Sequence, residues 1–289
     1  MLERYERVTF NDDGLSLAGD SLVAFLDGHP LAITALERID DSILERLPDL
    51  KVISKVGVGI DMIDLNAMER HGVRLGWSRG TNARSVSELV IALMLALLRH
   101  LPIATQLVRQ GEWRQVQGKT LTGKTVGIVG FGHVGRDLAE LLGHFSCQVL
   151  AYDIAPLADL PTHVEQASLE SLLNASDLVS LHAVLNEHTR NLFDAKRLAS
   201  MRPGALLINT SRGGLIDEDA LYDALSSGHL AGAALDVFST EPPGDHPLLG
   251  LDEVIATPHL GGSTSEAVLA MGRAAIDGLS QAVPVSKLE

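Results

Sequence analysis

Arginine, glutamate and histidine, the residue types needed to hold an acid group and move a proton, occur in three segments of the second half of the chain. Arg212 follows the apolar run 205–209 and is itself followed by Gly213 and Gly214. Its planar guanidinium matches a carboxylate with two parallel hydrogen bonds. A solvated loop arginine has the same local sequence, so Arg212 alone decides nothing.

His259 and Glu241 are candidates for the proton chemistry. Histidine exchanges protons near neutral pH, and His259 follows an expected strand. Glu241 precedes two prolines, which restrict its backbone, and a carboxylate beside a histidine orients the ring and favours its protonated form. Either residue alone is more often structural or solvated, because the chain has 11 histidines and acidic side chains are mostly exposed. With Arg212 they indicate a site that binds an anion and transfers a proton.

A glycine-rich turn is a candidate cofactor site. Gly130-Phe131-Gly132-His133-Val134-Gly135 is a G-x-G-x-x-G motif between an apolar run, 125–129, and a helical pattern. Asp153 follows the next apolar run, 18 residues after Gly135. Strand, glycine turn, helix, strand and acid form the dinucleotide-binding fingerprint, in which the turn and the helix N-terminus hold a pyrophosphate. The alternative, a glycine turn in a nucleotide-free α/β protein, does not need the acid at this distance.

Asp153 also bears on the choice of cofactor. Its carboxylate can accept hydrogen bonds from both ribose hydroxyls and would repel a 2′-phosphate, and no arginine occurs in Ile154-Ala155-Pro156. We therefore expect NAD rather than NADP. A carboxylate anchor, a proton donor and a hydride-carrying cofactor are together what the reduction of a 2-oxo acid requires.

The fold must bring these residues together. Short apolar runs alternate with helical patterns, which is typical of an α/β protein with a doubly wound parallel sheet. The expected strands are Lys51–Ser54, Thr125–Val129, Gln148–Tyr152, Leu178–Leu181, Ala205–Asn209, Gly232–Leu235 and Val254–Ala256. The expected helices include Asp64–Arg70, Ser85–Arg99, His133–Phe145, Asp217–Ser226 and Thr264–Gln281. Ligands bind outside the carboxyl ends of such strands, where the three candidate segments lie.

The mid-chain position of the glycine turn predicts two domains. A dinucleotide-binding unit usually opens its own domain, so most of the ~120 residues before it belong to another one. We expect a six-stranded, Rossmann-type NAD-binding domain at 89–262 and a smaller substrate domain at 1–88 and 263–289. The site is expected in the cleft between them.

Composition limits the class of partner. The net charge of −14 argues against a nucleic-acid or anionic-membrane surface. The single cysteine, Cys147, excludes an intramolecular disulfide and a multi-cysteine zinc site and suits a reducing compartment. The first residues form no signal peptide, and the longest apolar run, Leu89–Leu98, is ten residues long and predicts a buried helix rather than a membrane span. We expect a cytoplasmic protein with no metal, no membrane and no nucleic-acid partner.

The chain resembles a known family. The motifs that carry the resemblance are Ser54–Asp61, Gly130–Gly135, Arg202–Gly204, Asn209–Asp217, Asp236–Pro243 and Pro258–Ser263. In this order they resemble the D-isomer-specific 2-hydroxyacid dehydrogenases, most closely the phosphoglycerate-dehydrogenase-like branch. The resemblance implies a flavodoxin-like α/β substrate domain, NAD as cofactor, a small 2-oxo or 2-hydroxy acid as substrate, and a homodimer formed through the NAD-binding domain.

The resemblance also implies roles for single residues. Arg212 corresponds to the arginine that binds the substrate carboxylate, His259 to the general acid and base, and Glu241 to its carboxylate partner. The cofactor contacts correspond to Gly130, Gly132, His133, Val134, Gly135, Asp153, Thr210, Ser211 and Asp236. The substrate contacts correspond to Lys55, Val56, Gly57 and Val58, and the segment Val56–Gly59 corresponds to a loop that closes on the substrate.

Departures from the family pattern bear on the substrate. Trp77-Ser78-Arg79-Gly80 stands where the family commonly has Asn-x-Pro-Gly, and His182-Ala183-Val184-Leu185 where it has His-x-Pro-Leu. Phosphoglycerate dehydrogenases carry basic phosphate contacts at the positions of Lys55 and Thr34, and only Lys55 is basic here. We expect phosphoglycerate to be disfavoured unless Arg79 supplies the second charge to the substrate.

The N-terminal segment is a further departure. Tyr5–Phe10 resembles a part of the family that follows a strand and a helix, so one strand–helix unit of ~20–25 residues is expected to be missing. That strand is normally central in the substrate domain. We therefore expect a shortened substrate domain that folds poorly.

Two other functions stay open. Corepressors of the same fold keep these site residues, so the chain could be an NAD-sensing binding protein, although we find no docking surface or long disordered tail in the sequence. Phosphite dehydrogenases use the same arginine, glutamate and histidine. Formate dehydrogenases carry glutamine at the position of Glu241, and a zinc-dependent alcohol dehydrogenase needs more than one cysteine, so both are disfavoured.

Overall fold

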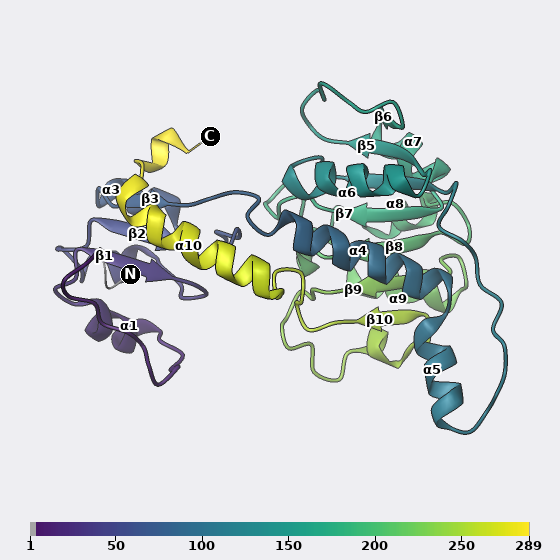
Figure 1. Ribbon diagram of the computed structural model, residues 1–289, viewed down its shortest axis with the longest axis horizontal. Coiled ribbons are helices and arrows are strands. Elements are labelled where there is room, and N and C mark those ends of the chain that lie inside the picture. Colours follow the sequence, from purple (N-terminus) through teal and green to yellow (C-terminus); the bar gives the residue numbers. More distant parts are fainter. Residues whose placement is uncertain (1–3, 289) are drawn as a thin grey trace. The chain divides into compact units, whose positions relative to one another are not determined.

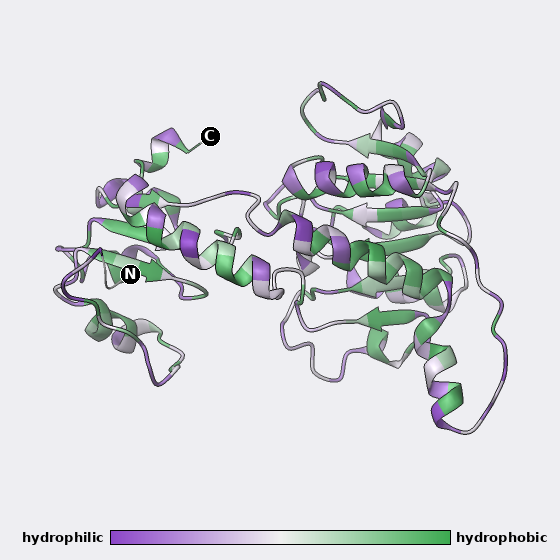
Figure 2. Ribbon diagram, in the orientation of Figure 1, coloured by the Kyte–Doolittle hydropathy of each residue, from purple (hydrophilic) through white to green (hydrophobic). Residues whose placement is uncertain are grey.

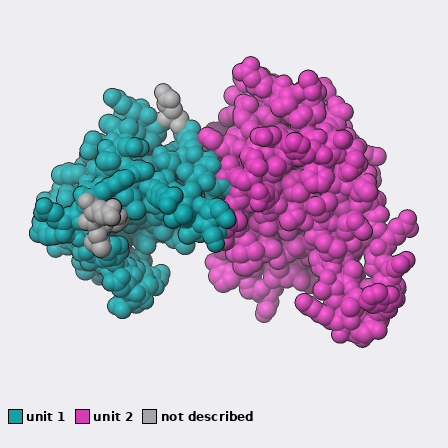
Figure 3. Space-filling model, viewed as in Figure 1, with its two compact units in different colours: residues 1–82, 265–289 teal, residues 83–264 magenta. Residues whose placement is uncertain are grey.

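The chain forms two compact units. The computed structural model describes residues 4–288. Met1–Asn82 and Ser265–Glu289 make up unit 1, and Ala83–Thr264 makes up unit 2 (Figure 3). The chain crosses from unit 1 to unit 2 after Asn82 and returns after Thr264. The boundaries expected from the sequence, after residues 88 and 262, lie six and two residues from these crossings.

Unit 2 contains a seven-stranded sheet in the order β10-β9-β8-β7-β4-β5-β6, in which every neighbouring pair is parallel. Its strands are β4 (Thr125–Val129), β5 (Gln148–Tyr152), β6 (Val164–Gln166), β7 (Leu178–Leu181), β8 (Leu206–Asn209), β9 (Gly232–Leu235) and β10 (Val254–Ala256). The chain moves outward from β4 to β5 on one side and from β7 to β8 on the other. The carboxyl ends of β4 and β7 therefore form the switch point at which such sheets bind ligands.

Helices cover both faces of this sheet. α4 (Ala83–Leu98) and α6 (His133–His144) lie on one face, and α7 (Leu169–Ala175), α8 (Ala195–Ser200) and α9 (Glu218–Ser226) lie on the other (Figure 1). Alternate residues of a strand enter different cores: Leu206 and Ile208 pack with α4 and α6, and Leu207 packs with α7 to α9. This explains why the central strands β7, β8 and β9 are buried along their whole length and consist mostly of apolar residues, coloured green in Figure 2.

α4 is the buried helix predicted from the longest apolar run. Val90 and Met94 are fully buried on its inner face. α5 (Leu101–Arg109) follows it after a bend of 62° and has no buried residue. Among residues 4–288 no single helix is long and apolar enough to cross a membrane, and α4 and α5 pass that test only as a bent pair.

Unit 1 contains a three-stranded parallel sheet in the order β1-β2-β3. Its elements are α1 (Gly19–Leu26), β1 (Leu31–Thr34), α2 (Asp41–Leu44), β2 (Val52–Lys55), α3 (Leu65–Arg70), β3 (Arg74–Gly76) and α10 (Ser265–Gln281). α10 packs directly on the sheet, because a Cβ added to Gly76 would lie 2.3 Å from the Gly278 carbonyl oxygen. Short 3₁₀ helices occur at η1 (Gly213–Leu215), η2 (Pro247–Gly250) and η3 (Val285–Lys287).

The predicted α/β class with a Rossmann-type parallel sheet is confirmed, and the expected helices begin and end within two residues of the observed ones. The expectation of six strands in unit 2 is wrong, because β6 is a seventh. β6 and β3 each contain one large apolar side chain, so neither forms an apolar run of the kind by which the equally short β10 was predicted. β1 of unit 1 was also not predicted. Poor folding of unit 1 stays a prediction.

Candidate active site

Three glycines shape the turn after β4, each for a different reason. Gly130 has a φ of 93°, and a Cβ there would lie 2.5 Å from the backbone nitrogen of Ala183. A Cβ on Gly135 would lie 2.4 Å from the Gly130 carbonyl oxygen, so α6 packs tightly against the turn. A Cβ on Gly132 would meet no atom within 4 Å. The chain's described residues leave this space open, as the approach of a pyrophosphate requires.

The N-terminus of α6 and Asp153 complete this end of the site. His133 and Val134 are the first two residues of α6, and the helix has no side-chain cap at Gly132. The first N–H groups of a helix have no intrahelical partner and attract anions. Asp153 follows β5, and its Oδ2 accepts a 2.7 Å hydrogen bond from the Phe131 backbone N–H. The acid is therefore fixed beside the glycine turn.

Two hydroxyl residues after β8 approach the same switch point. Ser211 Oγ donates a 2.7 Å hydrogen bond to the carbonyl oxygen of Ala183, which follows β7. Thr210 is buried, and within residues 4–288 its hydroxyl has no hydrogen-bond partner. A buried hydroxyl is normally paired, so a bound ligand is the natural partner for Thr210.

Arg212 is positioned by its own loop. Asn209 Nδ2 donates to the Arg212 carbonyl oxygen at 2.9 Å, and Asn209 Oδ1 accepts from the Ser211 N–H at 3.0 Å. Arg212 Nη1 donates to the Ser211 carbonyl oxygen at 2.7 Å. A Cβ on Gly213 would lie 1.9 Å from the carbonyl carbon of Phe238, so only glycine permits this approach of the loops after β8 and β9.

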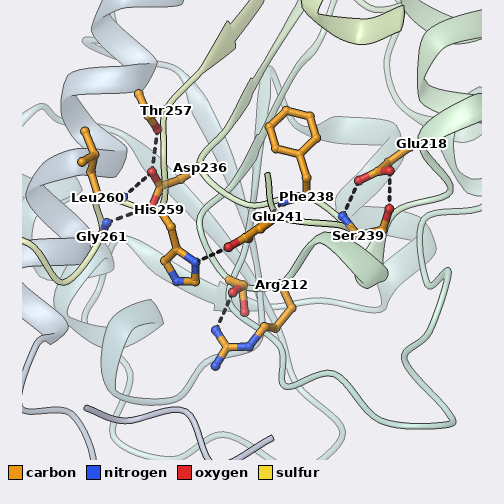
Figure 4. Close-up of polar contacts among 11 residues, drawn as sticks. Arg212, Glu218, Asp236, Phe238, Ser239, Glu241, Thr257, His259, Leu260 and Gly261 are labelled. Carbon is orange, nitrogen blue, oxygen red and sulfur yellow. Dashed lines mark hydrogen bonds and ion pairs between the residues drawn. The ribbon is translucent and has the colours of Figure 1, made fainter. Parts of the chain in front are cut away.

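His259 and Glu241 form an ion-pair geometry. His259 Nδ1 lies 2.9 Å from Glu241 Oε2, and Glu241 Oε1 accepts a 3.2 Å hydrogen bond from the Phe238 N–H. The side chains are 49% and 40% exposed, so a substrate can reach them. Figure 4 shows both side chains in the same region as Arg212. With Nδ1 directed to Glu241, the opposite ring nitrogen, Nε2, is the one available for proton transfer.

Asp236 anchors the turn that carries His259. Its carboxylate is buried and accepts hydrogen bonds from Thr257 Oγ1 at 2.6 Å, Leu260 N–H at 2.7 Å and Gly261 N–H at 2.8 Å (Figure 4). The Asp236 carbonyl oxygen also accepts from the His259 N–H. Asp236, predicted as a cofactor contact, therefore also stabilises the turn 257–261, a role that the sequence pattern does not reveal.

The predicted substrate residues of unit 1 meet at the carboxyl ends of its strands. Thr34 and Lys55 are side by side in the register of β1 and β2, and both are buried. Lys55 Nζ donates to the Val56 carbonyl oxygen at 2.6 Å, whereas the Thr34 hydroxyl has no partner among the described residues. The loop then turns at Gly57, which has a φ of 93°.

Trp77 and Arg79 lie beside this loop in unit 1. Trp77 Nε1 donates a 3.1 Å hydrogen bond to the Val58 carbonyl oxygen, and the Arg79 guanidinium lies 4.7 Å from the centre of the Trp77 ring. This cation–π contact holds Arg79 close to the loop 55–58. The expected substrate contacts are therefore grouped within unit 1, and their contact with a substrate stays a prediction: Lys55, Val56, Gly57, Val58 and Arg79.

His182 is a site neighbour whose state the sequence did not predict. It follows β7, its Nε2 lies 2.8 Å from Ser180 Oγ, and its carbonyl group faces Gly130. Burial lowers the pKa of His182 to about 4, so its ring is neutral at physiological pH. The sequence signal for His182 is its position in the segment that corresponds to the family's His-x-Pro-Leu.

A comparison with known families shows which family the chain belongs to. The model for the D-isomer specific 2-hydroxyacid dehydrogenase NAD binding domain matches residues 91–261, more than half of the chain. The chain belongs to the D-isomer-specific 2-hydroxyacid dehydrogenase family. The predicted resemblance and the predicted cofactor, NAD, are confirmed by this match.

Individual members of the family differ in substrate. The chain is 41% identical to a hydroxypyruvate reductase of Thermotoga maritima, over 84% of this chain and 80% of the relative. It is 39% identical to an (S)-sulfolactate dehydrogenase of Chromohalobacter salexigens, over 98% and 94%. It is 38% identical to a D-3-phosphoglycerate dehydrogenase of Mycobacterium bovis over 85% of this chain, but spans only 47% of that protein.

A solved structure of a dehydrogenase is also similar to this chain. A D-lactate dehydrogenase from Aquifex aeolicus, complexed with NAD and lactic acid, matches with a TM-score of 0.81 and 27% identity, over 91% of this chain and 89% of that chain. The family's NAD fits the residues of unit 2. Gly132 leaves room for the pyrophosphate, the N-terminus of α6 would hold it, Asp153 would hold the adenosine ribose, and Thr210 offers an unpaired hydroxyl.

Proposed function

We propose that the chain catalyses the NAD-dependent interconversion of a small D-2-hydroxy acid and its 2-oxo acid. The observation that carries the proposal is the 2.9 Å contact between His259 Nδ1 and Glu241 Oε2, at the carboxyl end of a sheet that also presents Arg212. A histidine held by a carboxylate and exposed at a ligand-binding edge is suited to general acid and base catalysis.

Each residue has a distinct role in this proposal. Arg212 binds the substrate carboxylate through its guanidinium and thereby orients the 2-oxo group. His259 gives a proton from Nε2 to the carbonyl oxygen during reduction and takes it back during oxidation. Glu241 orients the imidazole through the 2.9 Å contact at Nδ1. NADH, when bound, supplies the hydride.

We propose further that the substrate carries a second polar or anionic group on C3. Lys55 and Arg79 are cations of unit 1, and Thr34 beside Lys55 offers a buried hydroxyl. Hydroxypyruvate, sulfolactate and phosphoglycerate, named for three relatives, all carry such a group. A single lysine with a threonine, in place of two basic residues, favours a group of lower charge than a phosphate.

Steady-state oxidation of NADH tests the function. The 2-oxo acids to compare are hydroxypyruvate, glyoxylate, 3-sulfopyruvate and 3-phosphohydroxypyruvate, each with NADH and with NADPH. We expect turnover with NADH, and the highest kcat/KM for hydroxypyruvate or 3-sulfopyruvate. A folded protein that binds NADH but turns over none of these acids would contradict the proposal.

Arg79→Ala tests the substrate subsite. Loss of one charge-assisted hydrogen bond should raise KM for 3-sulfopyruvate and 3-phosphohydroxypyruvate about tenfold or more and leave KM for glyoxylate unchanged. Arg74→Ala is the matched control, because Arg74 is an exposed arginine of the same unit at the opposite end of β3. An unchanged KM for both dianionic acids would remove Arg79 from the subsite.

Two alternatives are separated by the same assays. An NAD-sensing corepressor-like protein would bind NADH without turning over any acid, and a phosphite dehydrogenase would reduce NAD with phosphite.

We also propose a homodimer formed through the NAD-binding unit. α5 supports this, since it has no buried residue, and Leu101, Val108 and Trp113 are exposed apolar side chains of the same region.

A further inference from the structure

Gly261 is held on both sides by side chains. Its N–H donates to Asp236 Oδ2 at 2.8 Å, and its carbonyl oxygen accepts a 2.6 Å hydrogen bond from Ser85 Oγ. A Cβ on Gly261 would lie 3.3 Å from Val86 Cγ2 and 3.4 Å from Asp236 Oδ2. Gly261 is therefore clamped between the end of β9 and the start of α4, two residues after His259.

The turn held by the contacts of Asp236 and Ser85 with Gly261 is strained. His259 has a φ of 54°, in the left-handed region that residues other than glycine rarely adopt. Such a conformation persists only where the surrounding contacts determine it. On one side these contacts come from Asp236, which binds Thr257, Leu260 and Gly261. On the other side, Ser85 Oγ donates a hydrogen bond to the Gly261 carbonyl oxygen.

The Ser85 hydrogen bond is a tertiary contact rather than a local one. A serine in a helix often donates to the carbonyl oxygen four residues earlier. Ser87 does this in the same helix, since its Oγ donates to Ala83 O at 3.0 Å. Ser85 instead donates to a residue 176 positions away. The serine is 8% exposed, so water does not readily replace its hydroxyl.

The bond also joins the two places where the chain passes between the units. Ser85 is the third residue of unit 2 after the first crossing, and Gly261 is the fourth residue before the second crossing. The two connecting segments are thus tied together inside unit 2, next to the turn of His259.

We propose that Ser85 is a positioning residue for His259 and links the crossings between the units to the catalytic turn. The proposal rests on the proposed role of His259, but the placement of the ring can be measured without any substrate. Without the Ser85 hydroxyl, the Gly261 carbonyl oxygen loses its side-chain donor, while the Asp236 hydrogen bonds and the contact between His259 and Glu241 remain.

NMR of the protein with ¹³C-labelled histidine Cε1 tests the placement. The His259 resonance is assigned from its absence in His259→Ala. We expect Ser85→Ala to shift or broaden this resonance and Ser85→Thr, which keeps a hydroxyl, to restore it. Ser176→Ala is the control, since Ser176 is also buried and donates to Leu172 O at 2.7 Å, away from the turn. An unchanged His259 resonance in Ser85→Ala would overturn the proposal, whether or not the protein proves to be a dehydrogenase.

Kinetics give a second readout. A displaced catalytic group costs about tenfold or more in rate, so Ser85→Ala should lower kcat by this factor while KM for the 2-oxo acid and Kd for NADH change less than about twofold. Ser85→Thr should recover most of kcat, and Ser176→Ala should lower the Tm without lowering kcat. Equal kcat losses in Ser85→Ala and Ser85→Thr would contradict the role of the hydroxyl. Absence of turnover in the wild-type protein would instead contradict the proposed function.

Discussion

His259 and Arg212 are each positioned by contacts with neighbouring side chains of unit 2. The imidazole gives Nδ1 to Glu241, and the Arg212 loop is fixed by Asn209. Such preorganisation is how a protein lowers a reaction barrier without new contacts. The chemistry depends on these few distances, so substitutions at this scale should separate binding from turnover.

Arg212→Ala and His259→Ala should fail in different ways. Arg212→Ala should raise KM and lower kcat together, because a bidentate carboxylate contact both binds and orients the 2-oxo acid. His259→Ala should lower kcat by about 10²–10⁴-fold with a smaller change in KM, as expected for the loss of a general acid. Steady-state kinetics with the best acid of the panel measure both effects. The reverse pattern would refute the assigned roles, and Kd for NADH serves as the control for folding.

At this scale the sequence allows the candidate functional side chains to be predicted, but not the tertiary hydrogen bonds that hold them. Arg212, Glu241 and His259 are recognisable because each follows a strand with turn residues around it. The duties of Asp236 and Ser85 are not recognisable, because each depends on a backbone group far along the chain: Gly261 is 25 residues from Asp236 and 176 from Ser85. Residue type and spacing do not encode such tertiary hydrogen bonds.

The element that organises the cofactor end is the turn from β4 into α6. Gly130 and Gly135 are required by backbone contacts within the chain, whereas Gly132 faces open space. The same motif therefore contains glycines needed for folding and a glycine needed for the ligand, and alanine substitutions should separate the two.

Gly132→Ala and Gly135→Ala form a matched pair. Gly135→Ala places a Cβ 2.4 Å from a carbonyl oxygen and should reduce the free energy of unfolding by about 1–3 kcal/mol. Gly132→Ala meets no atom of the described chain and has a φ of −79°, so it should cost less than Gly135→Ala: about 1 kcal/mol or less, the cost of alanine in place of glycine at a helix N-cap. Its Cβ should nevertheless weaken NADH binding about tenfold.

Thermal unfolding and NADH fluorescence titration measure the two effects. Gly130→Ala is an additional control, because its φ of 93° predicts a loss of stability like that of Gly135→Ala. Equal NADH affinity of Gly132→Ala and the wild-type protein would contradict the assignment of this space to the pyrophosphate.

The elements of unit 2 were predictable where they were long and apolar. β4 and β5 match the expected strands, and the buried helix α4 follows from its apolar run. β6, with one buried residue, and β1 and β3 of unit 1 were not predicted. Their pairing depends on neighbouring strands rather than on their own composition, so a single sequence does not reveal them.

On the scale of the whole molecule, one partly buried histidine, His182, ties stability to pH. Burial lowers the pKa of His182 to about 4, against 6.5 in an unfolded chain. Between these values the unfolded state binds a proton that the native state does not, so stability rises with pH there. His182 thus contributes fully above pH 6.5, and this contribution, about 3 kcal/mol, is lost progressively as the pH falls to 4.

Denaturant unfolding at several pH values checks this linkage. Between pH 4 and 6.5 the free energy of unfolding of the wild-type protein should fall more steeply than that of His182→Asn, whose side chain does not titrate but can still bond Ser180. The difference in slope should approach about 1.4 kcal/mol per pH unit, the value for one proton. Parallel curves for the two proteins would show that His182 is protonated in the native state.

We propose that the chain acts as a dehydrogenase of 2-hydroxy acids and that its chemistry takes place at the carboxyl end of the sheet in unit 2. The most direct measurement is mass spectrometry of the product formed from hydroxypyruvate or 3-sulfopyruvate with NADH deuterated at C4 of the nicotinamide. We predict one deuterium at C2 of a D-2-hydroxy acid, formed by the wild-type protein and at a greatly reduced rate by His259→Ala. A folded, NADH-binding protein that yields no deuterated hydroxy acid from any acid of the panel would contradict the account.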